Sequence, residues 1–170
     1  MKLLAVIDMQ NDFIDGALGT PEAVSIVPAV AKKIQEFRDK GYDIVFTRDT
    51  HSDDYLSTME GKKLPVVHCV KGTHGWEISD KLDTQGCTII NKPTFGSYDL
   101  AEYAASDPRI DEIAIIGLCT DICVISNAML IKAKLPELKI TVYADCCAGV
   151  TPQSHNNALN AMKMCHIDIV

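Results

Sequence analysis

Six short runs of apolar, largely β-branched residues recur along the chain, separated by longer amphipathic or polar stretches. Within each run the apolar residues are nearly continuous instead of alternating with polar ones, which is typical of strands covered by helices on both faces. We interpret as strands residues 3–7, 44–47, 88–90, 113–116, 140–143 and 167–170. The pattern therefore predicts a parallel sheet with helical connections.

Several stretches between these runs carry the period of about 3.6 residues that marks amphipathic helices. Residues 24–40 are the clearest case, because their apolar side chains recur at helical spacing and Gly41 follows basic residues at the end. Weaker periodicity predicts helices over residues 97–105, 122–134 and 153–164. We expect a single domain over residues 1–170, with a three-layer α/β/α architecture around a six-stranded parallel sheet.

Residues 50–81 interrupt this alternation, since they hold Gly, His, Asp and Pro without a persistent period. A loop of this length inside a compact domain is usually functional or disordered. Parallel α/β sheets bind ligands in the crevice beyond the carboxyl ends of their strands. We therefore look for chemistry at that edge of the sheet.

Composition and charge narrow the range of partners. The chain has 16 basic and 23 acidic residues, a formal charge of −7, and neither sign forms a block, so we expect no nucleic-acid or anionic membrane partner. No apolar stretch approaches the roughly 18 residues that span a bilayer. The seven cysteines are an odd number with no paired CxxC motifs and no N-terminal signal pattern. This predicts free thiols in a reducing cytoplasm instead of disulfides or a zinc ribbon.

A cysteine lies just beyond the fourth predicted strand. Residues 117–124, with the sequence GLCTDICV, pass from the strand through a glycine to a helix start that Thr120 or Asp121 could cap. The free N–H groups at a helix N-terminus lower the pKa of a thiol placed there. Cys123 is therefore a candidate nucleophile, although a cysteine among Ile and Val, taken alone, is more often a small buried hydrophobe.

Two ionisable residues follow neighbouring strands and could serve this cysteine. Asp8 follows residues 3–7, and Lys92 follows residues 88–90. A thiol needs a proton acceptor, which a carboxylate supplies, and a nearby cation stabilises the resulting anion. Each residue also has a simpler interpretation: Asp8 could cap a turn, Lys92 could be solvated, and Cys123 could belong to the core.

A second cluster contains Asp49, His51 and His68, with Glu60 between them in the long loop. One carboxylate and two imidazoles are a credible ligand set for a divalent metal. Residues two apart in an extended segment project to the same side, so Asp49 and His51 could reach one ion. His68 alone could be a hydrogen-bonded histidine on an apolar run. We expect structural or surface roles for the remaining histidines, His74, His155 and His166.

With these motifs the chain resembles the isochorismatase-like cysteine hydrolases, and within them the nicotinamidases. The resemblance covers nearly the whole domain and rests on residues 7–13, 47–51, 68–73, 91–92, 117–124, 145–149 and 155–159. It implies a Rossmann-like fold of the isochorismatase type. It also implies a catalytic triad in which Asp8 is the general base, Lys92 its cationic partner and Cys123 the nucleophile.

The resemblance has further implications for the backbone around this cysteine and for the substrate pocket. A non-proline cis peptide bond is expected between Leu118 and Cys119, and the backbone N–H groups of Cys119 and Cys123 would form the oxyanion hole. Phe13 could pack against the substrate ring, and Phe95 or Tyr98 could line the pocket. Simple core packing is an equally good interpretation of these three aromatic residues.

For the second cluster, the resemblance implies a divalent metal bound by Asp49, His51 and His68, with Glu60 as a fourth ligand that occurs in some nicotinamidases. Zinc is the expected ion, and iron or manganese are the alternatives. In nicotinamidases the ion holds the pyridine nitrogen while the carboxamide faces the thiolate. One departure from the family is Leu64 before Pro65, because nicotinamidases often carry Trp at that position.

The resemblance implies hydrolysis of a small-molecule amide, nicotinamide, to nicotinate and ammonia through a thioester, as in NAD salvage. An alternative is a related hydrolase acting on a carbamoyl, ureido or enol-ether substrate. Another is a catalytically silent member of the family that serves as a binding or assembly protein. Relatives are commonly dimers or tetramers, so a homo-oligomer is expected.

Overall fold

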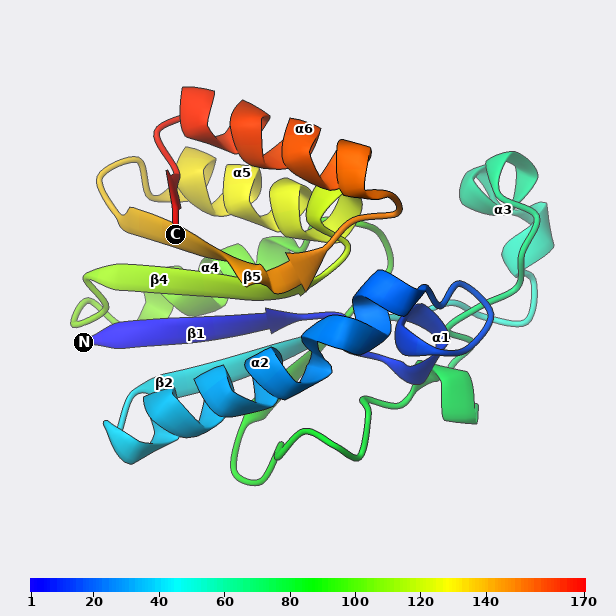
Figure 1. The fold of residues 1–170 in the computed structure, drawn as a ribbon, viewed down its shortest axis with the longest axis horizontal. Coiled ribbons are helices and arrows are strands. Elements are labelled where there is room, and N and C mark those ends of the chain that lie inside the picture. The colour runs from blue at the N-terminus through cyan, green and yellow to red at the C-terminus, as the bar shows by residue number, and fades with distance from the viewer.

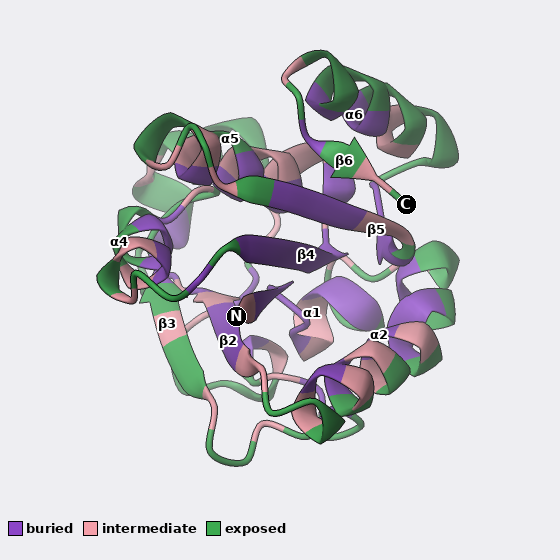
Figure 2. Cartoon of the chain, turned by 90° about the vertical axis from the view of Figure 1, so that its left-hand side faces the viewer, coloured by how far each residue is buried: buried purple, intermediate pink, exposed green.

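A computed structural model describes residues 1–170, and its six strands form one parallel sheet in the order β3-β2-β1-β4-β5-β6 (Figures 1 and 2). The strands are β1 (Lys2–Ile7), β2 (Asp43–Asp49), β3 (Thr88–Lys92), β4 (Glu112–Leu118), β5 (Lys139–Ala148) and β6 (Asp168–Ile169). The strand order reverses between β1 and β4, the position where open parallel sheets form a ligand crevice. The predicted α/β fold with a six-stranded parallel sheet is confirmed.

Helices cover both faces of the sheet, as the patterning predicted. Figure 1 shows α2 on one face, and α4, α5 and α6 on the other. The helices are α1 (Asn11–Ile14), α2 (Pro21–Asp39), α3 (Met59–Lys63), α4 (Tyr98–Ser106), α5 (Ile125–Lys134) and α6 (Pro152–Met164). Hydroxyl side chains cap α2, α4 and α6, supplied by Thr20, Ser97 and Thr151. None of these helices is long and apolar enough to cross a bilayer.

The two faces of the sheet carry separate halves of the core. Along β1, Leu4 and Val6 pack with α2, whereas Leu3, Ala5 and Ile7 pack with residues of α4, α5 and α6. Neighbouring side chains in a strand point to opposite faces, so a strand covered on both sides must be apolar at every position. This explains why the predicted strands appear in the sequence as continuous hydrophobic runs.

The structure differs from the sequence predictions at several element boundaries. Strand β5 extends to Ala148, five residues beyond the predicted end, because polar Asp145 interrupts its hydrophobic pattern. The predicted long loop includes the short helix α3, which Thr58 caps, and α1 was not predicted. Figure 1 shows α1 and α3 beyond the carboxyl ends of the strands, where no repeating apolar face marks them in the sequence.

The segment after β4 also differs from the predicted helix. Residues Thr120–Val124 form a π-helical turn, and α5 starts only at Ile125. The predicted cap at Thr120 or Asp121 is wrong, because neither side chain caps the turn. The Thr120 hydroxyl instead hydrogen-bonds with His155 Nδ1 (2.7 Å), and the Asp121 carboxylate accepts from the N–H of Val150. These contacts fix the turn against the first turn of α6 and the segment before it.

A glycine sets the path of the chain into this turn. Gly117 has a φ of 116°, and a Cβ there would lie 2.1 Å from the carbonyl oxygen of Ile7. Only glycine avoids both the positive φ and this contact. The end of β4 can therefore approach the end of β1 closely, which brings the π-helical turn next to Asp8.

Candidate active site

Three buried side chains from different elements meet at the carboxyl edge of the sheet. Lys92 Nζ lies 2.7 Å from Asp8 Oδ2 and 3.6 Å from Cys123 Sγ. Asp8 follows β1, Lys92 ends β3, and Cys123 lies in the π-helical turn after β4. The sequence predicted that these three residues lie at one edge of the sheet. In the structure they are in contact, and the Lys92 ammonium group lies beside both the Asp8 carboxylate and the Cys123 thiol.

Thr47 on β2 holds the carboxylate of this cluster and was not identified from the sequence. Its hydroxyl donates to Asp8 Oδ1 at 2.7 Å, and the backbone N–H of Asp8 donates to the same hydroxyl oxygen at 3.2 Å. Asp8 has a φ of 46°, which is uncommon for a residue other than glycine. The Thr47 contacts and the ion pair with Lys92 together fix the carboxylate in one orientation.

Burial and the charges in this cluster keep the thiol protonated and make the carboxylate its proton acceptor. Burial raises the pKa of Asp8, and Lys92 opposes that shift. Burial also raises the pKa of Cys123 well above its ordinary value, and the Asp8 charge adds to this effect. The lowered thiol pKa expected at a helix start is therefore wrong. The Cys123 thiol keeps its proton until a base removes it, and a carboxylate of raised pKa is the stronger base.

The backbone before Cys123 has the form that the resemblance implies. The Leu118–Cys119 peptide bond is cis, and the backbone N–H of Cys119 donates no hydrogen bond within the chain. A free donor beside a nucleophile can bind an oxyanion. Burial raises the pKa of the Cys119 thiol to about 12, so this side chain stays neutral.

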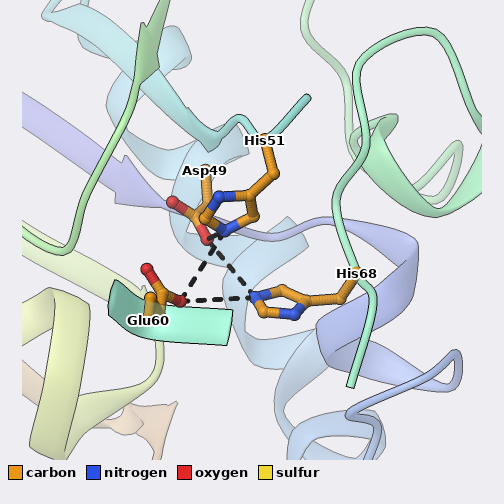
Figure 3. Close-up of side chains that lie close together, drawn as sticks. All are labelled: Asp49, His51, Glu60 and His68. Carbon is orange, nitrogen blue, oxygen red and sulfur yellow. Dashed lines mark hydrogen bonds and ion pairs between the residues drawn. The ribbon is translucent and has the colours of Figure 1, made fainter. Parts of the chain in front are cut away.

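A second group of side chains lies beside Asp8 and Lys92. Figure 3 shows Asp49, His51, Glu60 and His68 pointing toward one another, with their nearest ligand atoms all within 4.8 Å. His51 Nε2 lies 2.9 Å from Asp49 Oδ2, and His68 Nε2 lies 3.7 Å from the same oxygen. Glu60 Oε1 lies 3.7 Å from Nε2 of each histidine.

These spacings fit a bound metal ion. Ligands at 2.0–2.1 Å from a tetrahedral ion are roughly 3.3 Å apart, close to the spacings of 2.9 and 3.7 Å between these atoms. Burial alone would raise the pKa of Asp49, but hydrogen bonds from His51 and His68 hold this pKa well below its usual value. Asp49 is therefore ionised, as a metal ligand must be. Two imidazoles and two carboxylates suit zinc, iron or manganese.

Aromatic and backbone contacts orient the two imidazoles. His68 Nδ1 lies 2.8 Å from the carbonyl oxygen of Val66, which leaves Nε2 directed at the cluster. The buried ring of Tyr55 packs edge-on against both imidazoles, with centroid distances of 4.7 Å to His51 and 4.9 Å to His68. No sequence pattern identifies Tyr55, because this residue lies in the long loop, where no periodicity marks buried positions.

One cavity of about 220 Å³ connects the two groups of side chains. Cys119 and Cys123 line one part of it, and Asp49, Glu60 and His68 line another. Phe13 and Phe95 also line the cavity. The expectation for Tyr98 is wrong, because its side chain is 79% exposed at the start of α4 and lies outside the cavity lining.

Sequence comparison gives the family to which this arrangement belongs. The isochorismatase domain matches residues 2–169. The chain belongs to the isochorismatase family. Among curated members, a nicotinamidase/pyrazinamidase of Mycobacterium tuberculosis is 27% identical, with 100% of this chain and 98% of that protein covered. A protein of Arabidopsis thaliana described as a probable inactive nicotinamidase is 29% identical, covering 94% of this chain and 87% of the other.

A solved structure resembles this chain over nearly its full length. The pyrazinamidase of Pyrococcus horikoshii in complex with zinc is 32% identical, with a TM-score of 0.88. The alignment covers 99% of this chain and 98% of that one. The resemblance to isochorismatase-like hydrolases is therefore confirmed for both family and fold.

Proposed function

We propose that this isochorismatase-family protein is a metal-dependent nicotinamidase, which hydrolyses nicotinamide to nicotinate and ammonia. The chain is a hydrolase that acts on an amide C–N bond, in line with its curated relatives. The assignment of nicotinamide as the substrate is supported by the single cavity, which is lined both by Cys123 and by residues of the metal-ligand cluster. A ring nitrogen and a carboxamide on one small molecule could occupy its two parts together.

The lining of the cavity supports a small neutral ring as substrate. Its walls are mostly aliphatic and aromatic, including Leu18, Leu64 and Ile122, and no lysine or arginine lines it. A carboxylate placed against these aliphatic and aromatic walls would lose its hydration without gaining a lysine or arginine partner. Leu64 takes the place where nicotinamidases often have Trp, so this wall is aliphatic.

In the first half of the proposed reaction, Asp8 removes the proton from Cys123 Sγ, and the thiolate attacks the amide carbon. A carbon–sulfur bond forms, and the negative charge on the carbonyl oxygen is held by the backbone N–H groups of Cys119 and Cys123. Asp8 then returns its proton to the amide nitrogen. The carbon–nitrogen bond breaks, ammonia leaves and a thioester remains.

In the second half, water attacks the thioester while Asp8 accepts one of its protons. A carbon–oxygen bond forms, the carbon–sulfur bond breaks, and the proton on Asp8 restores the Cys123 thiol. Lys92 stays protonated throughout: although burial opposes its charge, the Asp8 and Cys123 charges raise the pKa of Lys92. Its positive charge offsets whichever of the two partners is an anion.

The metal proposed for this site is zinc, held by Asp49, His51, His68 and Glu60. The zinc complex of the Pyrococcus horikoshii pyrazinamidase supports zinc over iron or manganese. When bound, the ion supplies a Lewis acid that can anchor a neutral ring nitrogen. The ligands come from β2, α3 and the long loop, so binding also ties these segments together.

Ammonia release from a panel of amides, with and without metal, tests this function. We expect turnover of nicotinamide and pyrazinamide, loss of turnover after chelation, and recovery on adding zinc. Benzamide, which lacks the ring nitrogen, should be a poor substrate, because it cannot use the metal anchor. Equal turnover of benzamide, or full activity after chelation, would contradict the metal-dependent assignment. Turnover of a ureido compound alone would favour the related hydrolases.

The aromatic lining of the cavity gives a second prediction. Phe13→Leu should raise KM for nicotinamide roughly 2- to 10-fold, because an aromatic pair contributes about 0.5–1.5 kcal/mol beyond area burial. Tyr98→Leu is the matched control, since the same change outside the cavity should leave KM within about twofold of the parent. Steady-state kinetics on both variants measures the difference. Equal changes in KM for the two variants would show that Phe13 does not contact the substrate.

A further inference from the structure

The buried side chain of Gln10 hydrogen-bonds the backbone of Asp49, one of the proposed metal ligands. Its Nε2 donates to the carbonyl oxygens of Asp49 (2.8 Å) and Trp76 (2.9 Å). Its Oε1 accepts from the N–H of Asp49 at 2.7 Å. The carboxamide therefore holds both backbone groups of Asp49 and connects them to the loop that follows His68.

Asp12, two residues later, holds the backbone next to another ligand. Its Oδ2 accepts from the N–H of Cys69 at 2.8 Å, directly after His68. Cys69 has a φ of 48°, so the chain turns sharply at this point. Asp12 Oδ1 accepts from the N–H of Ala17 at 3.2 Å, which anchors the carboxylate to its own segment.

We propose that Gln10 and Asp12 are positioning residues that set the affinity of the metal site. The inference rests on the metal site of the proposed function. Asp49 and His68 come from segments that are far apart in sequence, and a short segment around α1 holds the backbone at both. Groups that fix metal ligands from outside typically change metal affinity 10- to 100-fold when removed. Neither residue touches the cavity, so their effect acts through the ligands.

The glycine at position 75 provides a way to disturb Asp12 without changing it. A Cβ at Gly75 would lie 2.1–2.4 Å from the carboxylate atoms of Asp12. Gly75→Ala should therefore push the carboxylate away from the N–H of Cys69. If Asp12 acts as proposed, Gly75→Ala should weaken metal binding in the same way as Asp12→Asn, and the two changes combined should not be additive.

The test measures zinc dissociation constants by competition with a chromophoric chelator. Gln10→Glu keeps the side-chain shape but loses both N–H donors, and Asp12→Asn loses one of two acceptors. We expect each variant to bind zinc about 10- to 100-fold more weakly than the parent. With cobalt as a probe, the visible absorption of the variants should also differ from the parent, since ligand geometry changes. Thermal midpoints at saturating zinc establish that each variant is folded.

Asn127 supplies a matched control. Its buried carboxamide also makes three hydrogen bonds to backbone groups, those of Ser97, Phe95 and Cys123, but it holds no metal ligand. Asn127→Asp should lower the thermal midpoint and leave the zinc affinity unchanged. Parent-like zinc affinity in Gln10→Glu, Asp12→Asn and Gly75→Ala would overturn the inference, as would an equal loss in Asn127→Asp. A parent chain that binds no zinc would instead refute the metal site itself.

Discussion

Replacing Cys123 with alanine is expected to abolish amide hydrolysis while the fold and the metal site are retained. Without the sulfur no thioester can form, and any residual rate depends on the oxyanion donors and substrate binding alone. Loss of a nucleophile from such a site lowers kcat by roughly 10⁴-fold or more. Ammonia release, zinc content and the thermal midpoint of the variant are the measurements.

The same substitution at Cys147 is the control for this experiment. Cys123 and Cys147 are both 4% exposed and belong to the same half of the core, but Cys147 lies on β5 outside the cavity. Each substitution removes one buried atom and should cost about 1 kcal/mol of stability. Activity should be lost in Cys123→Ala and retained in Cys147→Ala. Full activity of Cys123→Ala would refute the proposed mechanism.

The strands and the positions at their ends could be predicted from local sequence. Continuous apolar runs identify strands covered on both faces, and a parallel sheet places the residues that follow them at one edge. Asp8, Lys92 and Cys123 lie in contact for this reason. The resemblance added the cis peptide bond before Cys119, which no hydrophobic pattern could have indicated.

The contacts that depend on the long loop could not be predicted. Tyr55 packs against two imidazoles, and Gln10 binds backbone groups 39 and 66 positions away in the sequence. Such contacts have no periodicity, because each is made once and depends on the path of the whole chain. Tyr98 illustrates the opposite error: an aromatic residue near the site was assigned to the pocket, although the start of α4 directs it to solvent.

The electrostatic prediction for Cys123 failed for a related reason. A position near a helix start suggested a lowered thiol pKa, but burial and the Asp8 charge raise it. Burial is a property of the packed structure, and Asp8 lies 115 positions earlier in the sequence. The consequence for mechanism is substantial, since a protonated thiol makes the proton acceptor indispensable.

Asp8→Asn is accordingly expected to have the second large effect, and it should separate thiol reactivity from turnover. Asparagine has nearly the same shape but cannot accept the proton, so kcat/KM should fall by about 10²–10⁴-fold. Yet the Asp8 charge is one of the causes that raise the pKa of Cys123, whereas Lys92 lowers it. Removing that charge should lower the thiol pKa, so Cys123 should be alkylated faster at neutral pH while hydrolysis is lost.

The free energy of unfolding provides an independent measure of the ion pair between Asp8 and Lys92. Asp8 and Lys92 are both buried, so Asp8→Asn leaves a buried cation without its nearest partner, at a cost of about 3–5 kcal/mol. Asp49 Oδ1, 3.5 Å from Lys92 Nζ, should keep the cost near the lower end of this range. Denaturant unfolding with saturating zinc gives the value for the variant.

The double variant Asp8→Asn/Lys92→Met distinguishes a catalytic ion pair from a structural one. Methionine removes the uncompensated charge, so most of the stability lost in Asp8→Asn should return, as when buried ion pairs are replaced by apolar groups. Alkylation of Cys123 should slow again, because the cation that favours its thiolate is gone. Turnover should stay as low as in Asp8→Asn. If hydrolysis recovered together with stability, Asp8 would be holding the fold instead of accepting the proton.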